Sequence, residues 1–305
     1  MQRNSALQRV RGGWCRPVGV RKKLIGLVLL VLLPLVLLDA VQIYSRAHGH
    51  QQEDLQESLD FAGAIGTAFH NYIDSVWTAE LAIGTSLAYQ GPNTANAEAL
   101  LQEQLSHYQA VVRFTWLGAD GQVIAGTDPR MYGGQLADRQ HIQGIMAGES
   151  ANISDLMNSR ITGEPVITVS RGIREGHKLL GIIVATVDAR KIGVALPAQR
   201  PGSRLFGLVD RQGILVYRST DPDLDWARRR LTGGGPAPGA LRGEKTVIPE
   251  YQSAVDNTRR MGAAVPIPSI GWAAYATTAI ADVQAMARVE MLRSIAVLVL
   301  VIVTS

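Results

Sequence analysis

The chain has 305 residues, 47% hydrophobic and 18% charged, with a single cysteine and a formal net charge of +4. That length suits about two domains of ~150 residues, and one cysteine excludes a disulfide-stabilised scaffold. Seven of the 30 Lys and Arg residues lie among residues 1–23, which leaves 23 basic against 26 acidic residues elsewhere, so no nucleic-acid partner is expected.

Residues 24–44 have the composition of a transmembrane helix. The run Leu24–Leu38 contains no charged residue, and the whole stretch reaches the ~20 residues that a helix needs to cross the hydrocarbon core. The basic tail at residues 1–23 then predicts a cytoplasmic N-terminus. A cleaved signal peptide is the alternative, although its apolar region is usually only about 7–15 residues long.

Residues 45–109 are predicted to form a long stalk helix and a shorter packing helix. Apolar residues recur at intervals of three and four through residues 55–81, which is the period of an amphipathic helix. A Gly-Pro-Asn sequence at residues 91–93 then breaks this pattern, and residues 95–107 predict the second helix.

Residues 110–199 are predicted to form a module with one antiparallel sheet. The expected strands and helix are, in chain order, strands 111–117 and 123–125, helix 138–147, and strands 165–173 and 179–187. Asp120-Gly121 marks the turn of the first hairpin, and Glu175-Gly176 marks that of the second. A sheet with its helices set apart in this way is typical of an α+β domain.

The same pattern recurs in residues 200–280. Residues 114–129 read FTWLGADGQVIAGTDP and residues 206–222 read FGLVDRQGILVYRSTDP, so each contains an apolar strand, a turn, a second strand and Thr-Asp-Pro. Residues 261–278 supply closing strands, as residues 166–187 do in the first copy. The chain is therefore predicted to be α+β, with a long N-terminal helix and two tandem modules, each an antiparallel sheet flanked by helices.

Residues 281–305 are predicted to form a transmitter helix that leads into the start of a second transmembrane helix. After Arg293 the chain reads SIAVLVLVIVTS, which is apolar and lacks a polar cap. A core helix or strand is the alternative. With the basic tail inside the cell, two spans would place residues 45–292 outside the inner membrane of a bacterial cell.

In this order the elements resemble the double Cache (dCache) sensor family over about residues 45–285. The resemblance rests on the segments DGQVIAGTDP, GGQLADRQHIQGIMAGE, ISDLMNSRITGEPVITVSRGI followed by LLGIIVATVD, and VPIPSIGWAAYATT. It implies two PAS-like modules between two transmembrane helices, and a small-molecule site in the membrane-distal module. A signal would pass from that site to a cytoplasmic output domain.

These segments are most similar to those of sensor histidine kinases, with chemoreceptors and diguanylate cyclases as alternative outputs. The resemblance also implies a homodimer. The chain itself is not expected to be an enzyme, and no cofactor is predicted, because zinc-ligand spacing, a nucleophile elbow and a Walker loop are all missing from its sequence. A membrane-tethered extracytoplasmic enzyme is the alternative of another class, and it would need a polar catalytic constellation.

Seven residues of the first module are candidates for ligand contact. They are Trp116, Arg139, His141, Asp155, Ser159, Arg160 and Thr168. An anionic ligand needs a fixed cation, and Arg offers a bidentate fork to a carboxylate. Trp116 in a β-rich strand and Asp155 in a turn also fit purely structural roles. Farther along the chain, the charges at residues 228–230 are interpreted as a solvated face.

The resemblance adds detail to two of these positions. Asp138-Arg139 matches an Asp-Arg pair that is frequent in the family, and Ser159-Arg160 falls where many members contact a ligand. His141 stands where an aromatic residue is common, and the Arg-x-Trp-Tyr pattern of amino-acid-binding members is absent. The expected ligand is therefore a small molecule outside that subgroup, such as a carboxylate.

Overall fold

The computed structural model describes residues 20–90, 94–197, 204–231 and 233–285, with 288–289, 292–293 and 296. For residues 20–50 it describes the backbone alone. The chain divides into two compact units, residues 1–50 and 51–305, and the second unit holds all the strands of the described part.

The helix α1 (Val20–Gln90) confirms the predicted stalk helix, and α2 (Thr94–Leu105) follows where the second helix is predicted. In the part of α1 that belongs to the second unit, Ile65, Phe69 and Ile73 are completely buried. Because their spacing matches the helical period, they form one stripe that packs against the sheets.

The first module, residues 110–197, is built on one antiparallel sheet. Its elements are β1 (Val111–Gly118), β2 (Val123–Gly126), the short 3-10 helix η1 (Pro129–Met131), α3 (Gln140–Met146), β3 (Ala151–Ile153), β4 (Met157–Asn158), β5 (Pro165–Glu175), β6 (Lys178–Asp188) and η2 (Ala189–Ala195). The strand order is β2-β1-β6-β5-β3, and β4 pairs with β5. The predicted strands and helix are confirmed, whereas β3 and β4 were not predicted.

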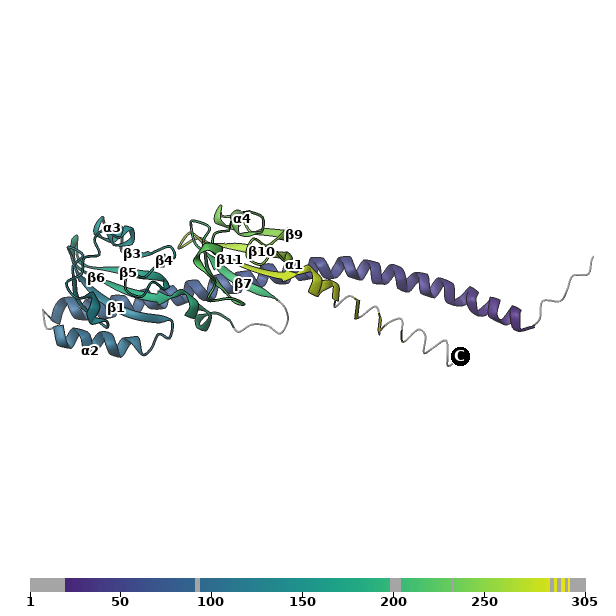
Figure 1. The fold of residues 1–305 in the computed structure, drawn as a ribbon, viewed down its shortest axis with the longest axis horizontal. Helices are drawn as coiled ribbons and strands as arrows, with labels where there is room; N and C mark the ends of the chain where they lie inside the picture. Colours follow the sequence, from purple (N-terminus) through teal and green to yellow (C-terminus); the bar gives the residue numbers. More distant parts are fainter. Residues whose placement is uncertain are drawn as a thin grey trace, which may run out of the picture. The chain divides into compact units, whose positions relative to one another are not determined.

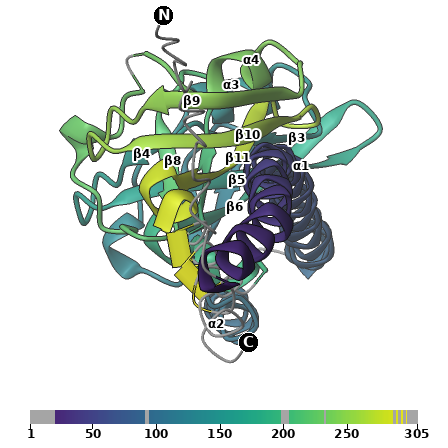
Figure 2. The same ribbon diagram turned by 90° about the vertical axis from the view of Figure 1, so that its right-hand side faces the viewer.

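The second module, residues 204–279, repeats this plan. Its elements are β7 (Leu205–Val209), β8 (Leu215–Arg218), η3 (Trp226–Arg228), α4 (Ala237–Leu241), β9 (Thr246–Gln252), β10 (Arg259–Ile267) and β11 (Trp272–Ala279). The strand order is β8-β7-β11-β10-β9, all antiparallel. Figure 2 shows β9, β10 and β11 side by side. The repeated order β2-β1-β6-β5 and β8-β7-β11-β10 agrees with the internal repeat in the sequence.

Helices cover both faces of the two sheets. Figure 1 shows α3 and α4 on one side, and α1 and α2 on the other. Strand alternation divides the core accordingly: Leu117 and Ile182 of the first sheet pack under α3, while Phe114 and Ile183 pack toward α1.

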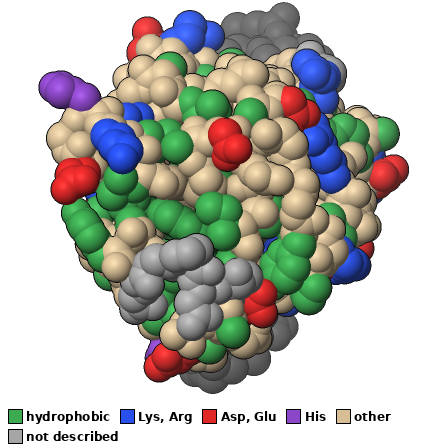
Figure 3. All heavy atoms as spheres, turned by 90° about the vertical axis from the view of Figure 1, so that its left-hand side faces the viewer, with side chains coloured by type: hydrophobic (Ala, Val, Ile, Leu, Met, Phe, Trp, Pro, Cys, Tyr) green, Lys and Arg blue, Asp and Glu red, His purple; other side chains and the backbone are tan. Residues whose placement is uncertain are grey.

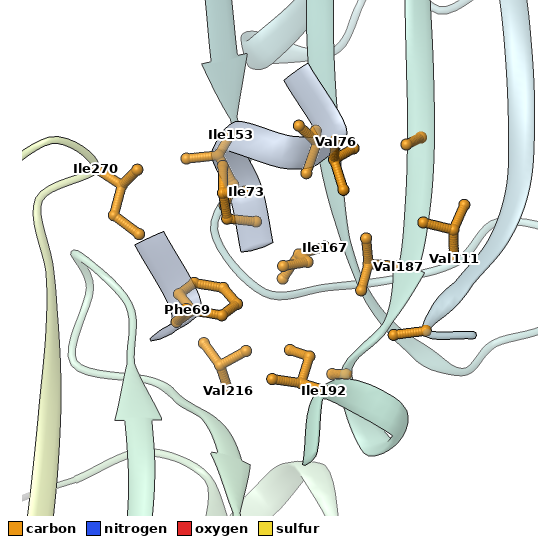
Figure 4. Close-up of a cluster of buried hydrophobic side chains, with 14 of the residues drawn as sticks. Phe69, Ile73, Val76, Val111, Ile153, Ile167, Val187, Ile192, Val216 and Ile270 are labelled. Atoms are coloured by element: carbon orange, nitrogen blue, oxygen red, sulfur yellow. The ribbon is translucent and has the colours of Figure 1, made fainter. Parts of the chain in front are cut away.

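One hydrophobic cluster runs through both modules along α1. Figure 4 shows Ile73 and Val76 of α1 beside Ile167 of the first sheet, with Phe69 beside Val216 of the second. Phe69 also stacks on the ring of Trp272 in β11 of the second module, with ring centroids 5.3 Å apart. The helix α1 therefore packs against both sheets, and the three elements share one hydrophobic core.

Among the residues whose side chains are described, no helix is both long and apolar enough to cross a membrane. The predicted span at residues 24–44 lies within α1, and its side chains are outside that part. Of the predicted second span, which follows Arg293, the structure describes only residue 296, and the predicted module boundary at residue 200 lies outside the described residues.

The interpretation of residues 228–230 as a solvated face is wrong for Arg229, of which only 1% is exposed. Its guanidinium donates hydrogen bonds to four backbone carbonyl oxygens at 2.9–3.1 Å, those of Leu215, Val216, Pro222 and Leu224. The side chain holds the irregular segment after β8 against the sheet, because each carbonyl gains a charged donor.

Figure 3 faces the end of the second unit that carries α2 and the first module. Basic and acidic side chains are interspersed across this face, and none of the blue regions extends into a continuous basic surface.

Candidate ligand-binding site

A cavity of about 260 Å³ lies on the face of the first sheet that α3 also covers. Its floor is a polar row across three strands: Arg113 of β1 is paired in register with Thr186 of β6, which is paired with Thr168 of β5. Thr115 lies two residues beyond Arg113 on the same face. The sheet therefore presents three hydroxyl groups and one guanidinium to the cavity.

The alternation of β1 explains why this row is polar. Arg113 and Thr115 face the cavity, whereas Phe114 and Trp116 belong to the core cluster on the α1 side. A polar side chain at every second position of an apolar strand is the pattern of a sheet with one functional face.

Three segments form the walls of the cavity. The first is the loop that contains η1 and continues to Leu136, and the second is the start of α3, with Arg139 and His141. The third is β4 and the turn after it, residues 157–161. The lining residues thus come together around the cavity although Arg113 and Thr186 are 73 positions apart in sequence, as expected for a site between a sheet and its covering loops.

Four arginines line the cavity, and its lining contains no acidic residue. Two of them, Arg113 and Arg130, pair with the carboxylate of Asp128, which is not part of the lining. Asp128 Oδ2 is 3.5 Å from Nη1 of Arg113 and 2.8 Å from Nη2 of Arg130. The Arg113 side chain is 6% exposed, and its Nε has no partner among the described residues. Burial lowers the pKa of Arg113, so this cation is held there against a desolvation cost.

The other two arginines differ in their partners. Arg160 is paired with Asp138, through an Nη1–Oδ1 contact of 3.3 Å and a second, shorter contact. The guanidinium of Arg139 forms no ion pair with a described residue, and it donates only to the sulfur of Met157, at 3.8 Å. Because thioether sulfur is a weak acceptor, Arg139 has most of its hydrogen-bonding capacity available to a ligand.

His141 and Thr168 add buried polar groups to the cavity. Burial, with a contribution from Arg139, lowers the pKa of His141 to about 4, so its imidazole is neutral at physiological pH. The hydroxyl of Thr168 is buried without a hydrogen-bond partner among the described residues. An unpaired buried polar group costs free energy, and a bound ligand that reaches it would recover that cost.

Five of the seven residues predicted from sequence line this one cavity. They are Arg139, His141, Ser159, Arg160 and Thr168. Trp116 lies instead in the core cluster, where its ring fills the space over Gly181, so its placement does not support ligand contact. Arg113 and Thr186 were missed, although a polar residue inside an apolar strand was the available signal.

Asp155 does not line this cavity, but it lines an adjoining hollow of about 440 Å³ together with Arg139, His141 and Arg160, at the junction of the two modules. Its carboxylate accepts hydrogen bonds from Arg211 Nε at 2.8 Å and from Gln212 Nε2 at 3.3 Å, both in the turn between β7 and β8. Asp155 therefore ties the second module to the segment between β3 and β4, and this segment leads directly to the cavity wall at Met157.

No three His, Cys, Asp or Glu side chains of the described residues gather in a way that could hold a metal ion. What the cavity offers is a set of hydrogen-bond donors around a cation with few partners. That arrangement can hold a small anion by charge-assisted hydrogen bonds.

The profile dCache_1, described as a Cache domain, matches residues 42–287. No curated protein matches the chain. A similar solved structure is the extracellular domain of rpHK1S-Z16, a protein assigned as a histidine kinase, with a TM-score of 0.60 and 16% identity over 75% of this chain and 95% of its own.

Two chemoreceptor domains are similar to the same extent. The ligand-binding domain of Campylobacter jejuni Tlp3, in complex with 4-methylisoleucine, has a TM-score of 0.57 and 14% identity over 76% of this chain and 93% of its own. That of Pseudomonas fluorescens CtaA, in complex with L-alanine, has a TM-score of 0.56 and 16% identity over 76% and 98%. At these identities the likeness shows a common fold.

Proposed function

Since the chain belongs to the dCache_1 family of Cache domains, which provide ligand-binding sensor domains to membrane receptors, we propose that it senses a small carboxylate outside the cell. The ligand would bind in the cavity of the first module, which would be the membrane-distal one. Binding would change the packing of the segments that surround it and so pass a signal to an output domain.

The single observation that carries this proposal is the unpaired Arg139 in a lining without acidic residues. A carboxylate would accept a bidentate pair of hydrogen bonds from the guanidinium of Arg139. The hydroxyls of Thr168 and Ser159 are further polar groups on the same cavity. A single charge-assisted interaction of this kind is worth about 1.5–3 kcal/mol, which corresponds to roughly 10- to 150-fold in affinity.

The same lining distinguishes a simple carboxylate from an amino acid. Tlp3 and CtaA were solved with 4-methylisoleucine and L-alanine, which carry an ammonium group beside the carboxylate. An ammonium group needs acceptors, preferably a carboxylate, but the cavity lining contains no acidic residue, and Asp128 and Asp138 are already paired with its arginines. We therefore propose that acids without an α-amino group bind in preference to the matching amino acids.

A thermal-shift comparison of matched ligand pairs tests this proposal, because a ligand that binds only the native state raises the melting temperature. Propionate is compared with L-alanine, and isovalerate with L-valine, for the wild type and for Arg139→Gln. We expect the acid of at least one pair to stabilise the wild type more than its amino acid. The shift should be lost in Arg139→Gln but retained in Arg242→Gln, an exposed arginine of the second module.

Two results would contradict the proposal. If the amino acid of each pair gave the larger shift, the ligand class would be wrong. If Arg139→Gln bound carboxylates as the wild type does, the site would be wrong even though the fold remains that of a sensor.

The topology and the output are further parts of the proposal. We propose that residues 24–44 and a second span after residue 293 cross the inner membrane, with residues 45–292 outside and a homodimer as the signalling form. The similarity of fold to rpHK1S-Z16 supports a histidine kinase as the output, and Tlp3 and CtaA support a chemotaxis output as the alternative.

The single native cysteine makes the topology testable. An impermeant maleimide applied to intact cells should label an introduced cysteine in Tyr89→Cys, because Tyr89 is 67% exposed. It should not label Cys15 in the wild type. Labelling of Cys15 without permeabilisation would place the N-terminus outside and refute the proposed orientation.

A further inference from the structure

A second cavity lies in the second module, on the face of the sheet that α4 covers. It has a volume of about 40 Å³, and its lining includes Arg218 of β8, Tyr251 of β9, Arg260 of β10 and Tyr275 of β11. Backbone atoms of residues 233–235 complete its wall. None of these groups takes part in the carboxylate site proposed for the first module.

Two glycines make room for the tyrosine rings of this cavity. Gly207 is paired in register with both Arg218 and Tyr275, and a Cβ on Gly207 would lie 2.7 Å from the Tyr275 hydroxyl. The ring of Tyr275 can thus lie across β7, on the side of Arg218. Gly235, at φ +92°, approaches the ring of Tyr251, where a Cβ would be 3.0 Å away.

The charge in this cavity is positive. Arg218 and Arg260 both reach the same oxygen of Asp256, at 2.5 Å and 2.7 Å, so two guanidinium groups share one carboxylate. Asp256 itself is not part of the lining. Although burial alone would raise the pKa of Asp256, hydrogen bonds from Arg260, Ser253 and Arg218 lower it well below its ordinary value. The carboxylate is therefore ionised, and one positive charge remains uncompensated.

One donor of this cavity lacks an acceptor among the described residues. The Arg218 side chain is 5% exposed, and the Nε of Arg260 is buried with no partner among the described residues. Burial raises the pKa of the Tyr251 and Tyr275 phenols, so both hydroxyls stay protonated and can donate. A site that offers donors and one net positive charge is complementary to a single negative charge.

We propose that this cavity is a second binding site, for one small monovalent anion of the size of formate or acetate. A buried water needs about 10–15 Å³ of such volume, so 40 Å³ holds about three water-sized groups and excludes larger carboxylates. The anion would accept hydrogen bonds from Arg260 Nε and from the tyrosine hydroxyls. It would neutralise the excess charge of the arginine pair and stabilise the second module.

The test is a titration of the full chain with acetate, followed by the melting temperature, in an Arg139→Gln background that removes the site of the first module. Ionic strength is held constant with gluconate, a carboxylate too large for 40 Å³. We expect a saturable rise in melting temperature in Arg139→Gln. Adding Arg260→Gln should weaken acetate binding at least about tenfold, since one charge-assisted partner is lost.

Arg259→Gln is the matched control, because Arg259 is adjacent in sequence but exposed, and it pairs with Glu250 outside the cavity. It should leave acetate binding unchanged. Arg260→Lys is a second variant that can keep the ion pair with Asp256 but lacks Nε, and it should also bind acetate about tenfold more weakly.

Three results would overturn the second site. These are the absence of a saturable acetate effect in Arg139→Gln, an effect that survives Arg260→Gln, and an equal loss in Arg259→Gln. The two proposals can fail separately. If wild type and Arg139→Gln bind all acids alike while Arg260→Gln abolishes acetate binding, the first site is wrong and the second stands.

Discussion

The carboxylate of Asp210 links the two modules, and its removal is expected to destabilise both. Asp210 is completely buried at the end of β7. One oxygen accepts from Gln212 N and Ile214 N, each at 2.9 Å, within the turn of its own module. The other accepts from Leu156 N of the first module at 3.1 Å. Asp210→Ala leaves these three backbone donors without their acceptor.

The magnitude follows from burial. Leu156 and Ile214 are both buried, and each unsatisfied N–H costs about 1–3 kcal/mol. Part of that cost is offset, because burial raises the pKa of the Asp210 carboxyl and its removal relieves an unfavourable desolvation. A net loss of about 3 kcal/mol is expected, which lowers the melting temperature of a domain of this size by about 6–12 °C. Asp210→Asn, which keeps an acceptor oxygen, should lose less than half as much.

Thermal unfolding followed by circular dichroism measures this loss, and the internal repeat provides the control. Asp120 occupies the matching turn of the first module, where it is exposed and accepts a hydrogen bond from Gln122 N of the same turn at 3.1 Å. Asp120→Ala should cost less than about 1 kcal/mol. If the two alanine variants lowered the melting temperature equally, the inference that Asp210 joins the modules would be refuted.

Three further predictions concern buried groups of the core and the cavity. Burial raises the pKa of Glu80 well above 4.5, so the contribution of this carboxyl to the stability of the native state is complete at low pH and is lost as the pH rises. Glu80→Gln should therefore raise the melting temperature at pH 8 and leave it unchanged near pH 4. A lower melting temperature at both pH values would contradict this. For His141 the sign is opposite, because its pKa falls from 6.5 to about 4 on folding. The native state should therefore lose up to about 3 kcal/mol of stability as the pH falls from 6.5 to about 4. The curve of stability against pH for His141→Gln should lack this loss. Gly181→Ala places a Cβ 2.3 Å from the ring of Trp116 and should cost about 1–3 kcal/mol in denaturant unfolding, whereas Gly63→Ala, with nothing within 4 Å, should not destabilise.

Much of the fold could be predicted because its signals are local. The stripe of α1 and the hairpins around Gly121 and Gly176 follow from periodicity and turn chemistry within short windows. The strands β3 and β4 could not be predicted, since they have only three and two residues and exist by pairing with the distant β5.

The candidate site divides in the same way. Arg139 and Arg160 stand in loops, where charged residues are visible as candidates for binding. Arg113 is inside an apolar strand, and only the register with β6 shows that its side chain faces the cavity. Arg229 is the opposite case, a charge in a polar run whose burial depends on four carbonyl groups that no sequence pattern reveals.

The shared core along α1 limits how this protein can be recombined with its relatives. A chimera that exchanged only residues 204–279 would keep Phe61 and Phe69, whose rings pack on Phe206 and Trp272 of the original module. The incoming sheet would meet a helix shaped for another surface. An exchangeable segment must therefore include the matching stretch of α1, even though Phe61 and Phe206 are 145 positions apart in sequence and Phe69 and Trp272 are 203 apart. The unit that can be exchanged between relatives is therefore α1 together with both sheets, and not a single module.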